Sequence, residues 1–203
     1  VIKNYCEYFQ PEIKPFLTIK NIEKYKGKNN DLNNDKFIEK LKKEVEEDFY
    51  LKRQEGENDN YLCKLIRINA IEEFIIYTEK ANIKLDNIIK KSIFETNHFL
   101  LENGDIKLIE YASFYGSNDI IKYMQMNGVK LTQDMWACAI HSGNAELINL
   151  LEENHVLLID KEEILRESIK CHHNEISNYI IDFLIKEEDL QNNIENRYDD
   201  NLY

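Results

Sequence analysis

The chain has 203 residues, of which 43% are hydrophobic and 32% charged, and its formal net charge at pH 7 is −12. This length allows one or two domains with a hydrophobic core, whereas the acidic balance argues against a nucleic-acid partner, because phosphate binding relies on Lys and Arg. No hydrophobic run is long enough to span a bilayer or to serve as a secretory segment, so we expect no membrane partner.

The N-terminal residues 1–59 are predicted to form a helical extension. Pro11 and Pro15 fall within residues 9–17, where they are expected to break any helix and set an extended stretch. A helix is predicted over residues 35–51, because Phe37, Leu41 and Val45 recur at helical spacing. A charged, glycine-containing stretch at residues 53–59 then indicates a domain boundary.

From residue 60 onward, short apolar segments alternate with polar turns, which predicts paired helices joined by short connections. The pairs are expected at residues 61–68 with 70–79, 106–115 with 117–127, 133–142 with 144–154, and 161–171 with 174–186. Residues 80–105 interrupt this order and are interpreted as an extended insertion. The repeat domain is therefore predicted at residues 60–188, and the acidic residues 189–203, with little to bury, are expected to be disordered.

One short pattern occurs three times, in residues 108–124, 135–151 and 164–180. Each copy has a small residue, a turn residue four positions later and, after three more, an acid followed by an aliphatic residue. The small residues are Ala112, Ala139 and Ser168, and the turn residues are Gly116, Gly143 and His172. Repetition at a short period is typical of solenoids, in which each helix pair buries its apolar face against its neighbours.

Residues 107–117 and 134–144 fit the core and the glycine turn of an ankyrin repeat position by position, residues 163–173 fit more loosely, and residues 60–70 fit least. The chain thus resembles divergent ankyrin repeat proteins, such as the large ankyrin-like families of single-celled eukaryotes, over about residues 60–186. The Thr-Pro pair is missing from every unit, and the spacings are 47, 27 and 29 residues instead of about 33. These spacings are counted between Leu62, Ile109, Trp136 and Leu165. The resemblance implies an all-α, ankyrin-like α-solenoid of short helix-turn-helix repeats with an N-terminal helical extension.

In ankyrin repeats the two positions before each turn residue point to the concave face, so the resemblance implies a partner-binding surface there. The corresponding residues are Arg67, Ile68, Phe114, Tyr115, His141, Ser142, Lys170 and Cys171. We therefore predict a protein-protein interaction module or scaffold that binds an unidentified protein partner, as a monomer or with weak self-association. Phe114 has an alternative place, packed beneath the insertion at residues 80–105.

A structural role is the alternative to this binding role. The last predicted helix carries Ile180, Ile181 and Phe183, and a terminal repeat needs a polar outer side to remain monomeric. The chain would then self-assemble by stacking through its terminal repeats.

No pattern in the chain predicts a catalytic residue, a cofactor or a metal ion, so we expect no enzyme. The phosphate-loop, nucleophile-elbow and zinc-protease motifs are missing. Cys171, His172 and His173 are adjacent, but successive helical residues point about 100° apart and cannot converge on one ion. Cys138 and His141 stand three residues apart on one predicted helix, a proximity that arises often by chance.

The spacing of all four cysteines likewise predicts no metal site. The spacing of Cys6, Cys63, Cys138 and Cys171 matches neither a zinc motif nor a short disulfide framework. We therefore expect reduced thiols in a cytoplasmic protein, with the nucleus as the alternative. Trp136 occupies the leucine position of its repeat and is expected to fill the core.

Overall fold

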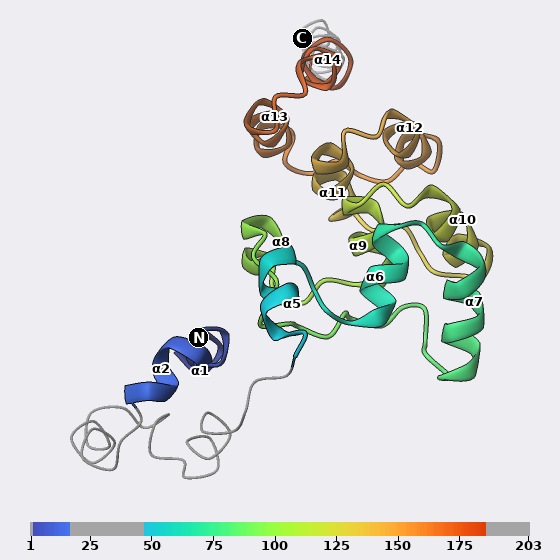
Figure 1. Ribbon diagram of the computed structural model, residues 1–203. Helices are drawn as coiled ribbons and strands as arrows, with labels where there is room; N and C mark the ends of the chain where they lie inside the picture. The colour runs from blue at the N-terminus through green and yellow to red at the C-terminus, as the bar shows by residue number, and fades with distance from the viewer. Residues whose placement is uncertain (1, 17–46, 186–203) are drawn as a thin grey trace, which may run out of the picture. The chain divides into compact units, whose positions relative to one another are not determined.

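The computed structural model describes residues 2–16 and 47–185, which are drawn in colour in Figure 1. Helices account for most of these residues and no strand occurs among them, which confirms the predicted all-helical class for this part of the chain. Within it, the one β-like feature is an isolated antiparallel bridge between Ile88 and Lys107. None of the helices in these two ranges is long and apolar enough to cross a membrane.

The chain divides into two compact units, which we call unit 1 and unit 2. Unit 1 comprises Val1–Asn60 and Lys90–Gly104, and unit 2 comprises Tyr61–Ile89 and Asp105–Tyr203. The predicted insertion at residues 80–105 is thus shared between the two units. Most of the predicted helix at residues 35–51, and all of the predicted tail at residues 189–203, lie outside the described residues.

The described part of unit 1 contains short helical segments. They are α1 (Ile2–Tyr8), α2 (Gln10–Ile13), the 3-10 helix η1 (Lys14–Phe16), α5 (Phe49–Glu55) and α8 (His98–Glu102). The predicted extended stretch at residues 9–17 is wrong where it is described, since Pro11 lies in the first turn of α2 and Pro15 lies in η1. Proline is compatible with a first helical turn, because its missing N–H would have no intrahelical partner there.

Residues 47 and 48 form a turn, so the predicted helix at residues 35–51 does not continue unbroken to residue 51.

Helix α5 is joined to other segments of unit 1 by contacts near its C-terminal end. Gly56 ends α5 with a left-handed backbone, φ 68°. Its carbonyl accepts hydrogen bonds from the backbone N–H and the hydroxyl of Thr96, at 3.0 and 2.8 Å. Arg53 of α5 forms two hydrogen bonds with the carboxylate of Glu12, at 2.7 and 3.0 Å, so α5 is tied to both flanking segments of unit 1.

The described part of unit 2 consists of four helix pairs, each with a first and a second helix. They are α6 (Tyr61–Arg67) with α7 (Ile71–Lys80), α9 (Leu108–Phe114) with α10 (Asn118–Met126), α11 (Met135–Ser142) with α12 (Ala145–Glu153), and α13 (Lys161–Lys170) with α14 (Asn174–Tyr179). The π-helix η3 (Ile180–Ile185) follows α14. Each pair lies where the sequence predicts one, with ends that differ by a few residues.

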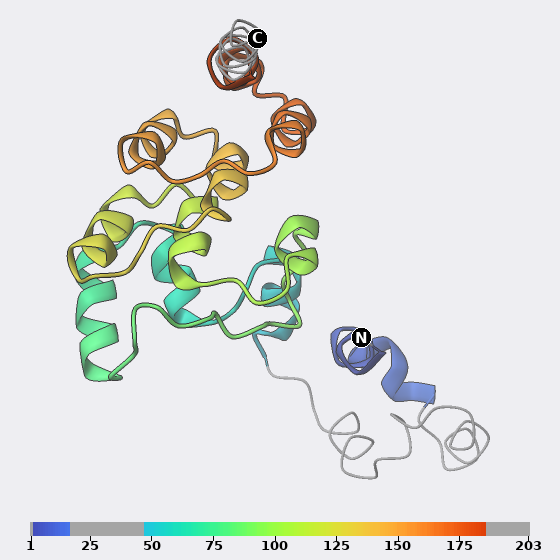
Figure 2. The same ribbon diagram turned by 180° about the vertical axis from the view of Figure 1, so that it is seen from behind.

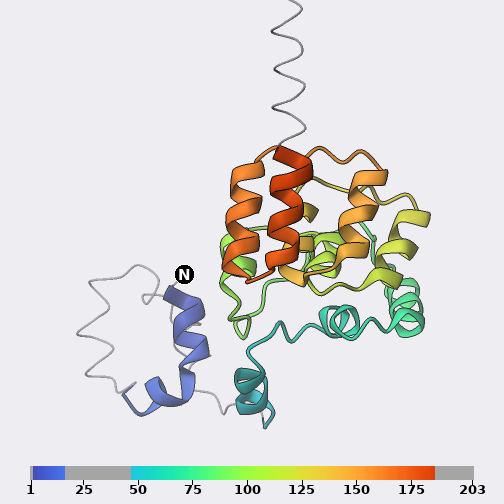
Figure 3. The same cartoon turned by 90° about the horizontal axis from the view of Figure 1, so that it is seen from above.

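The first helices of the four pairs, α6, α9, α11 and α13, pack in that order, each against the next. Each also packs against the second helix of its own pair, and α7 packs against α10. Figures 1 and 2 show the row of first helices with α7, α10 and α12 beside it. Figure 3, seen from above, shows α13 and α14 lying side by side. The row of first helices carries the predicted binding positions.

Each first helix is followed within two residues by a residue with a left-handed backbone, and in three of the four pairs this is the predicted turn residue. The angle φ is 50° at Asn69, 66° at Gly116, 62° at Gly143 and 59° at His172. The N–H of the following residue bonds back across the turn, as from Ser117 to the carbonyl of Ala112. This is the Schellman arrangement, which satisfies carbonyls that the end of a helix leaves open. Asn and His adopt a positive φ more readily than most side chains, which explains the two copies without glycine.

The core of the described part of unit 2 is mostly aliphatic, and small and aromatic residues occupy particular positions in it. Ala112, Ala139 and Ser168 are completely buried, as expected where neighbouring helices approach closely. Trp136 is 3% exposed and its indole N–H donates to a backbone carbonyl at 3.0 Å, which confirms the predicted core position. The hydroxyls of Ser168 and Ser177 lie 2.7 Å apart and join α13 to α14. The same small position therefore serves packing in all three predicted copies.

Candidate functional site

A continuous strip of contacting side chains runs along the four first helices of unit 2, and we call it the inner strip. Its members are Arg67, Tyr111, Phe114, Tyr115, His141, Glu167, Lys170 and Cys171. Six of these are among the eight residues predicted to bind a partner. Every two neighbouring first helices are joined by at least one contact of the strip.

Arg67 forms the α6 end of the inner strip. Its guanidinium donates a hydrogen bond of 3.0 Å to the hydroxyl of Tyr111 on α9. Tyr111 is completely buried, and this burial, helped by the nearby Tyr115, raises the pKa of its phenol. The phenol therefore stays neutral, and the bond from Arg67 satisfies a buried polar group. Tyr111 is not among the residues predicted from the sequence, although it lies one helical turn before the predicted Tyr115.

The middle of the inner strip is aromatic. The rings of Tyr111 and Tyr115 are 4.8 Å apart, and those of Phe114 and Tyr115 are 5.1 Å apart. The ring of Phe114 lies 5.3 Å from the imidazole of His141, which joins α9 to α11. Phe114, Tyr115 and His141 are all half-buried. Each of these rings therefore packs on its neighbours and still offers part of its surface to a partner.

Charged and sulfur-containing groups around His141 form the α13 end of the inner strip. The Nδ1 atom of His141 lies 3.4 Å from Sγ of Cys171, and its Nε2 atom lies 3.2 Å from Oε2 of Glu167. Lys170 contacts the other carboxylate oxygen of Glu167, Oε1. The side chains of His141 and Glu167 are 17% and 13% exposed, so only a small part of each is accessible to water.

Burial and charge set the protonation of this end of the strip. Burial lowers the pKa of His141, although the carboxylate of Glu167 opposes that shift. Burial alone would raise the pKa of Glu167, but Lys170 and His141 outweigh it, so that this pKa is lowered overall. Burial, together with the Glu167 carboxylate, raises the pKa of the Cys171 thiol. At neutral pH the imidazole and the thiol are therefore uncharged and the carboxylate is charged.

The other two predicted binding residues lie beside the strip. Ile68 follows Arg67 at the end of α6 and is 65% exposed, so it adds an apolar side chain to the α6 end. Ser142 follows His141 and is half-buried. Its hydroxyl donates a hydrogen bond of 2.9 Å to the carbonyl of Ala139 in its own helix. The hydroxyl of Ser142 is therefore already used within α11.

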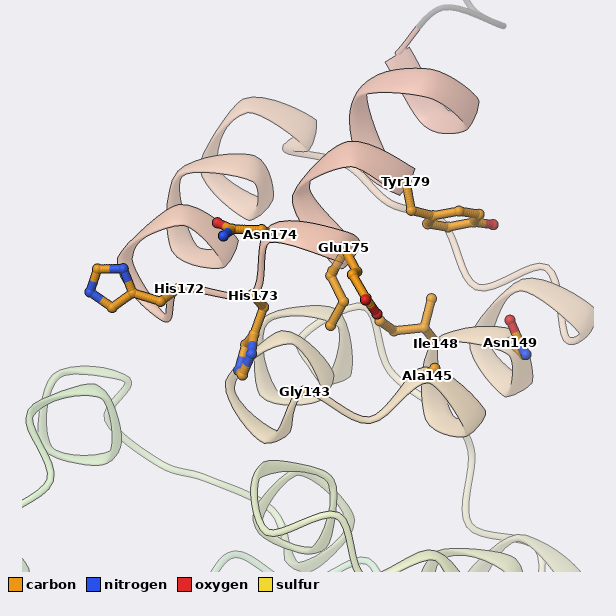
Figure 4. Close-up of a pocket in the computed structure, with 10 residues that line it drawn as sticks. Gly143, Ala145, Ile148, Asn149, His172, His173, Asn174, Glu175 and Tyr179 are labelled. Atoms are coloured by element: carbon orange, nitrogen blue, oxygen red, sulfur yellow. The ribbon is translucent and has the colours of Figure 1, made fainter.

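The residue combinations considered for chemistry in the sequence form no shared site. Cys138 is 4% exposed and its burial raises the pKa of the thiol, so it is no accessible thiolate nucleophile. His141 contacts Cys171 of the next first helix. In Figure 4 the side chains of His172 and His173 point in different directions, with His173 towards Gly143. The contact between His141 and Cys171 arises from packing of α11 against α13, which sequence spacing alone does not reveal.

Two grooves in the described part of unit 2 lie between second helices. The smaller, about 260 Å³, lies between α10 and α12. It is bridged by Glu146 of α12, which accepts hydrogen bonds from Asn118 at 2.7 Å and from Lys122 at 2.6 Å. Both donors are on α10. This groove is therefore crossed by polar contacts between successive helix pairs.

The larger groove, about 590 Å³, lies between α12 and α14 and is shown in Figure 4. Ala145 and Asn149 of α12 line it, 27 residues after Asn118 and Lys122. Glu175 of α14 faces them at the position that follows the turn by three residues. The side chain of Ala145 has no hydrogen-bond donor, and that of Asn149 is shorter than the lysine at the matching position, Lys122. Glu175 therefore lacks the pair of hydrogen bonds that Glu146 accepts across the smaller groove. Helices α12 and α14 are joined instead by a hydrogen bond from the hydroxyl of Tyr179 to the carboxylate of Glu152.

Comparison with protein-family models, with curated proteins and with solved structures gave no match for this chain.

Proposed function

We propose that unit 2 is a protein-binding module, an ankyrin-like α-solenoid that holds a protein partner against the inner strip. The observation that carries this proposal is the strip itself, which joins four successive first helices through direct side-chain contacts. A partner that covers the strip would contact several repeats at once, which is how solenoid proteins use their extended surfaces.

Three features of unit 2 support a solenoid of ankyrin type. The first helices pack in sequence order, and each ends in the same left-handed turn. A completely buried small residue recurs in three of the repeats. The short spacing also fits a reduced form of the repeat, because residues 129–132 leave little room for the hairpin that usually joins ankyrin units.

The composition of the inner strip favours a protein partner. Arginine and tyrosine are the usual anchors of protein interfaces, and both occur in the strip beside the exposed Ile68. The net charge of −12 disfavours nucleic acid. The four cysteines form no disulfide with one another, which supports a cytoplasmic setting for this interaction.

The test is a quantitative pull-down from a lysate of the source cells with three forms of the protein. The strip variant carries Tyr115→Ser, His141→Ser and Lys170→Ser, and the control variant carries Met126→Ser and Lys130→Ser at exposed positions outside the strip. Circular dichroism first establishes that all three forms have the same helix content. We expect a protein that the wild type and the control capture and the strip variant loses. Equal capture by all three forms would refute the inner strip as the binding surface.

Self-assembly through the terminal repeat is the second candidate function. In η3, which follows the last helix pair, Ile180 is 1% exposed, whereas Ile181 is 38% exposed and leaves apolar surface on this end of the unit. Light scattering over a range of concentrations separates the two roles. A constant monomer mass supports the binding module, and a mass that rises with concentration and falls back in Ile181→Ser supports assembly.

A further inference from the structure

We propose that His141, Glu167 and Cys171 form a zinc-binding site at the α13 end of the inner strip. One donor atom from each of the three side chains lies within 4.8 Å of the other two. His141 comes from α11, while Glu167 lies on α13 and Cys171 caps the C-terminus of the same helix four residues later. All three ligands belong to this chain, so the zinc site can be tested independently of the proposed binding function.

The three donors are those that zinc accepts in proteins. Zinc binds imidazole nitrogen, thiolate sulfur and carboxylate oxygen at about 2.0–2.3 Å, which places tetrahedral ligand atoms about 3.4–3.6 Å apart. The distance from Nδ1 of His141 to Sγ of Cys171 is 3.4 Å, which matches this spacing. Oε2 of Glu167 lies 3.2 Å from the other ring nitrogen, Nε2, so this carboxylate must move to reach an ion on Nδ1. One nitrogen coordinates one ion, so Nδ1, which already faces the sulfur, is the ligand. Rotation of the Glu167 side chain would bring its carboxylate oxygen to the ion bound at Nδ1.

Neighbouring groups orient two of the three ligands, Glu167 and His141. Lys170 contacts Oε1 of Glu167, so Oε2 is the oxygen that would turn from Nε2 of His141 to the ion. The ring of Phe114 packs against the imidazole of His141 at 5.3 Å and restricts its rotation. Groups that orient the ligands in this way commonly raise metal affinity by 10- to 100-fold. Lys170 and Phe114 are therefore expected to contribute although neither touches the ion.

Three protein ligands leave one position of a tetrahedral zinc ion for water or for a donor from outside. Water reaches this end of the strip, because the side chains of His141 and Glu167 are partly exposed. When zinc binds, the Cys171 thiol gives up its proton to solvent and the thiolate takes its place on the metal. The thiolate is what favours zinc over calcium and magnesium, which prefer oxygen ligands.

The test is a titration of the metal-free full chain with Co²⁺, which replaces zinc and reports a thiolate ligand through a charge-transfer band in the near ultraviolet. We expect one equivalent to bind, and Zn²⁺ to displace it. Cys171→Ser should abolish the band, and Glu167→Gln should weaken binding at least tenfold. His172→Asn is the matched control: it removes an exposed histidine beside Cys171, and asparagine tolerates the left-handed backbone of that turn, φ 59°.

Circular dichroism of each variant establishes that it folds before metal is added. The proposal is overturned if the wild type gives no charge-transfer band, or if the band persists in Cys171→Ser. It is also overturned if His172→Asn loses the band together with Cys171→Ser, because the metal would then bind adjacent surface groups and not the cluster with His141.

Discussion

Gly143 offers a sharp test of the turn geometry, because two separate causes require glycine there. Its φ is 62°, a left-handed backbone in which other L-residues are strained. A Cβ atom at this position would also lie 2.8 Å from Cε1 of the His173 imidazole. Gly128 has φ 84° but no heavy atom within 4 Å of such a Cβ. Gly128→Ala therefore measures backbone strain alone, and Gly143→Ala measures strain together with the contact.

The two substitutions are expected to differ by about a factor of two in free energy. A left-handed backbone costs a non-glycine residue roughly 1–2 kcal/mol, and the stiffer unfolded chain offsets about 0.4–1 kcal/mol of this. Gly128→Ala should thus destabilise the protein by about 1 kcal/mol. Gly143→Ala must also displace the His173 ring, and overpacking of this kind adds about 1 kcal/mol, at the low end because the ring borders an open groove.

Urea unfolding followed by circular dichroism gives these free energies directly. The free energy of the contact is isolated by a double-mutant cycle that combines Gly143→Ala with His173→Ala, and the coupling should be about 1 kcal/mol. The reasoning fails if Gly143→Ala and Gly128→Ala lose equal stability, or if the coupling between Gly143 and His173 is close to zero.

Three further predictions concern the packing and the pH response of unit 2. Ala139→Leu should overpack a completely buried site and lower the free energy of unfolding by about 1–3 kcal/mol, so an unchanged melting temperature would contradict the repeat alignment. Ala145→Asn combined with Asn149→Lys should bridge to Glu175 and stabilise by about 0.2–1 kcal/mol, a gain that should fade at high salt and be lost in Glu175→Gln. With a chelator present, the urea midpoint should fall as the pH drops below 6.5, because burial makes the pKa of His141 lower in the folded than in the unfolded chain. His141→Gln should flatten that fall between about pH 7 and 5.5, and equal slopes in both forms would contradict the assignment.

The helix pairs and their turns could be predicted from the sequence because both depend on local rules. Apolar spacing sets the helices, and the positive φ at the end of each first helix selects Gly116 and Gly143. The weaker copies also follow a local rule, since Asn69 and His172 belong to the residue types that accept this backbone. Pro11 was misjudged because its effect depends on whether it lies in the first turn of a helix or farther along it.

The inner strip could be predicted only in part, because it depends on the register between helices. Tyr111 and Glu167 each lie one helical turn before a predicted residue, and only packing against the neighbouring helix brings them into the strip. The grouping of His141, Glu167 and Cys171 could not be predicted for the same reason. Cys171 and His172 are adjacent in the sequence, but the left-handed backbone at His172 separates their side chains. Packing of α13 against α11 instead places Cys171 beside His141.

The turn at Gly143 also links stability to function. His173, the first residue after the next turn, packs directly against Gly143, and Gly143 follows His141 by only two residues. Displacement of the His173 ring should therefore shift α13 relative to α11 and move Cys171 away from His141. Gly143→Ala is expected to weaken Co²⁺ binding by about tenfold, as disruption of groups around a metal site commonly does, whereas Gly128→Ala should leave it unchanged. Equal Co²⁺ affinity in both variants would mean that the α11–α13 contact is set by the buried core around Ala139 and not by the turn.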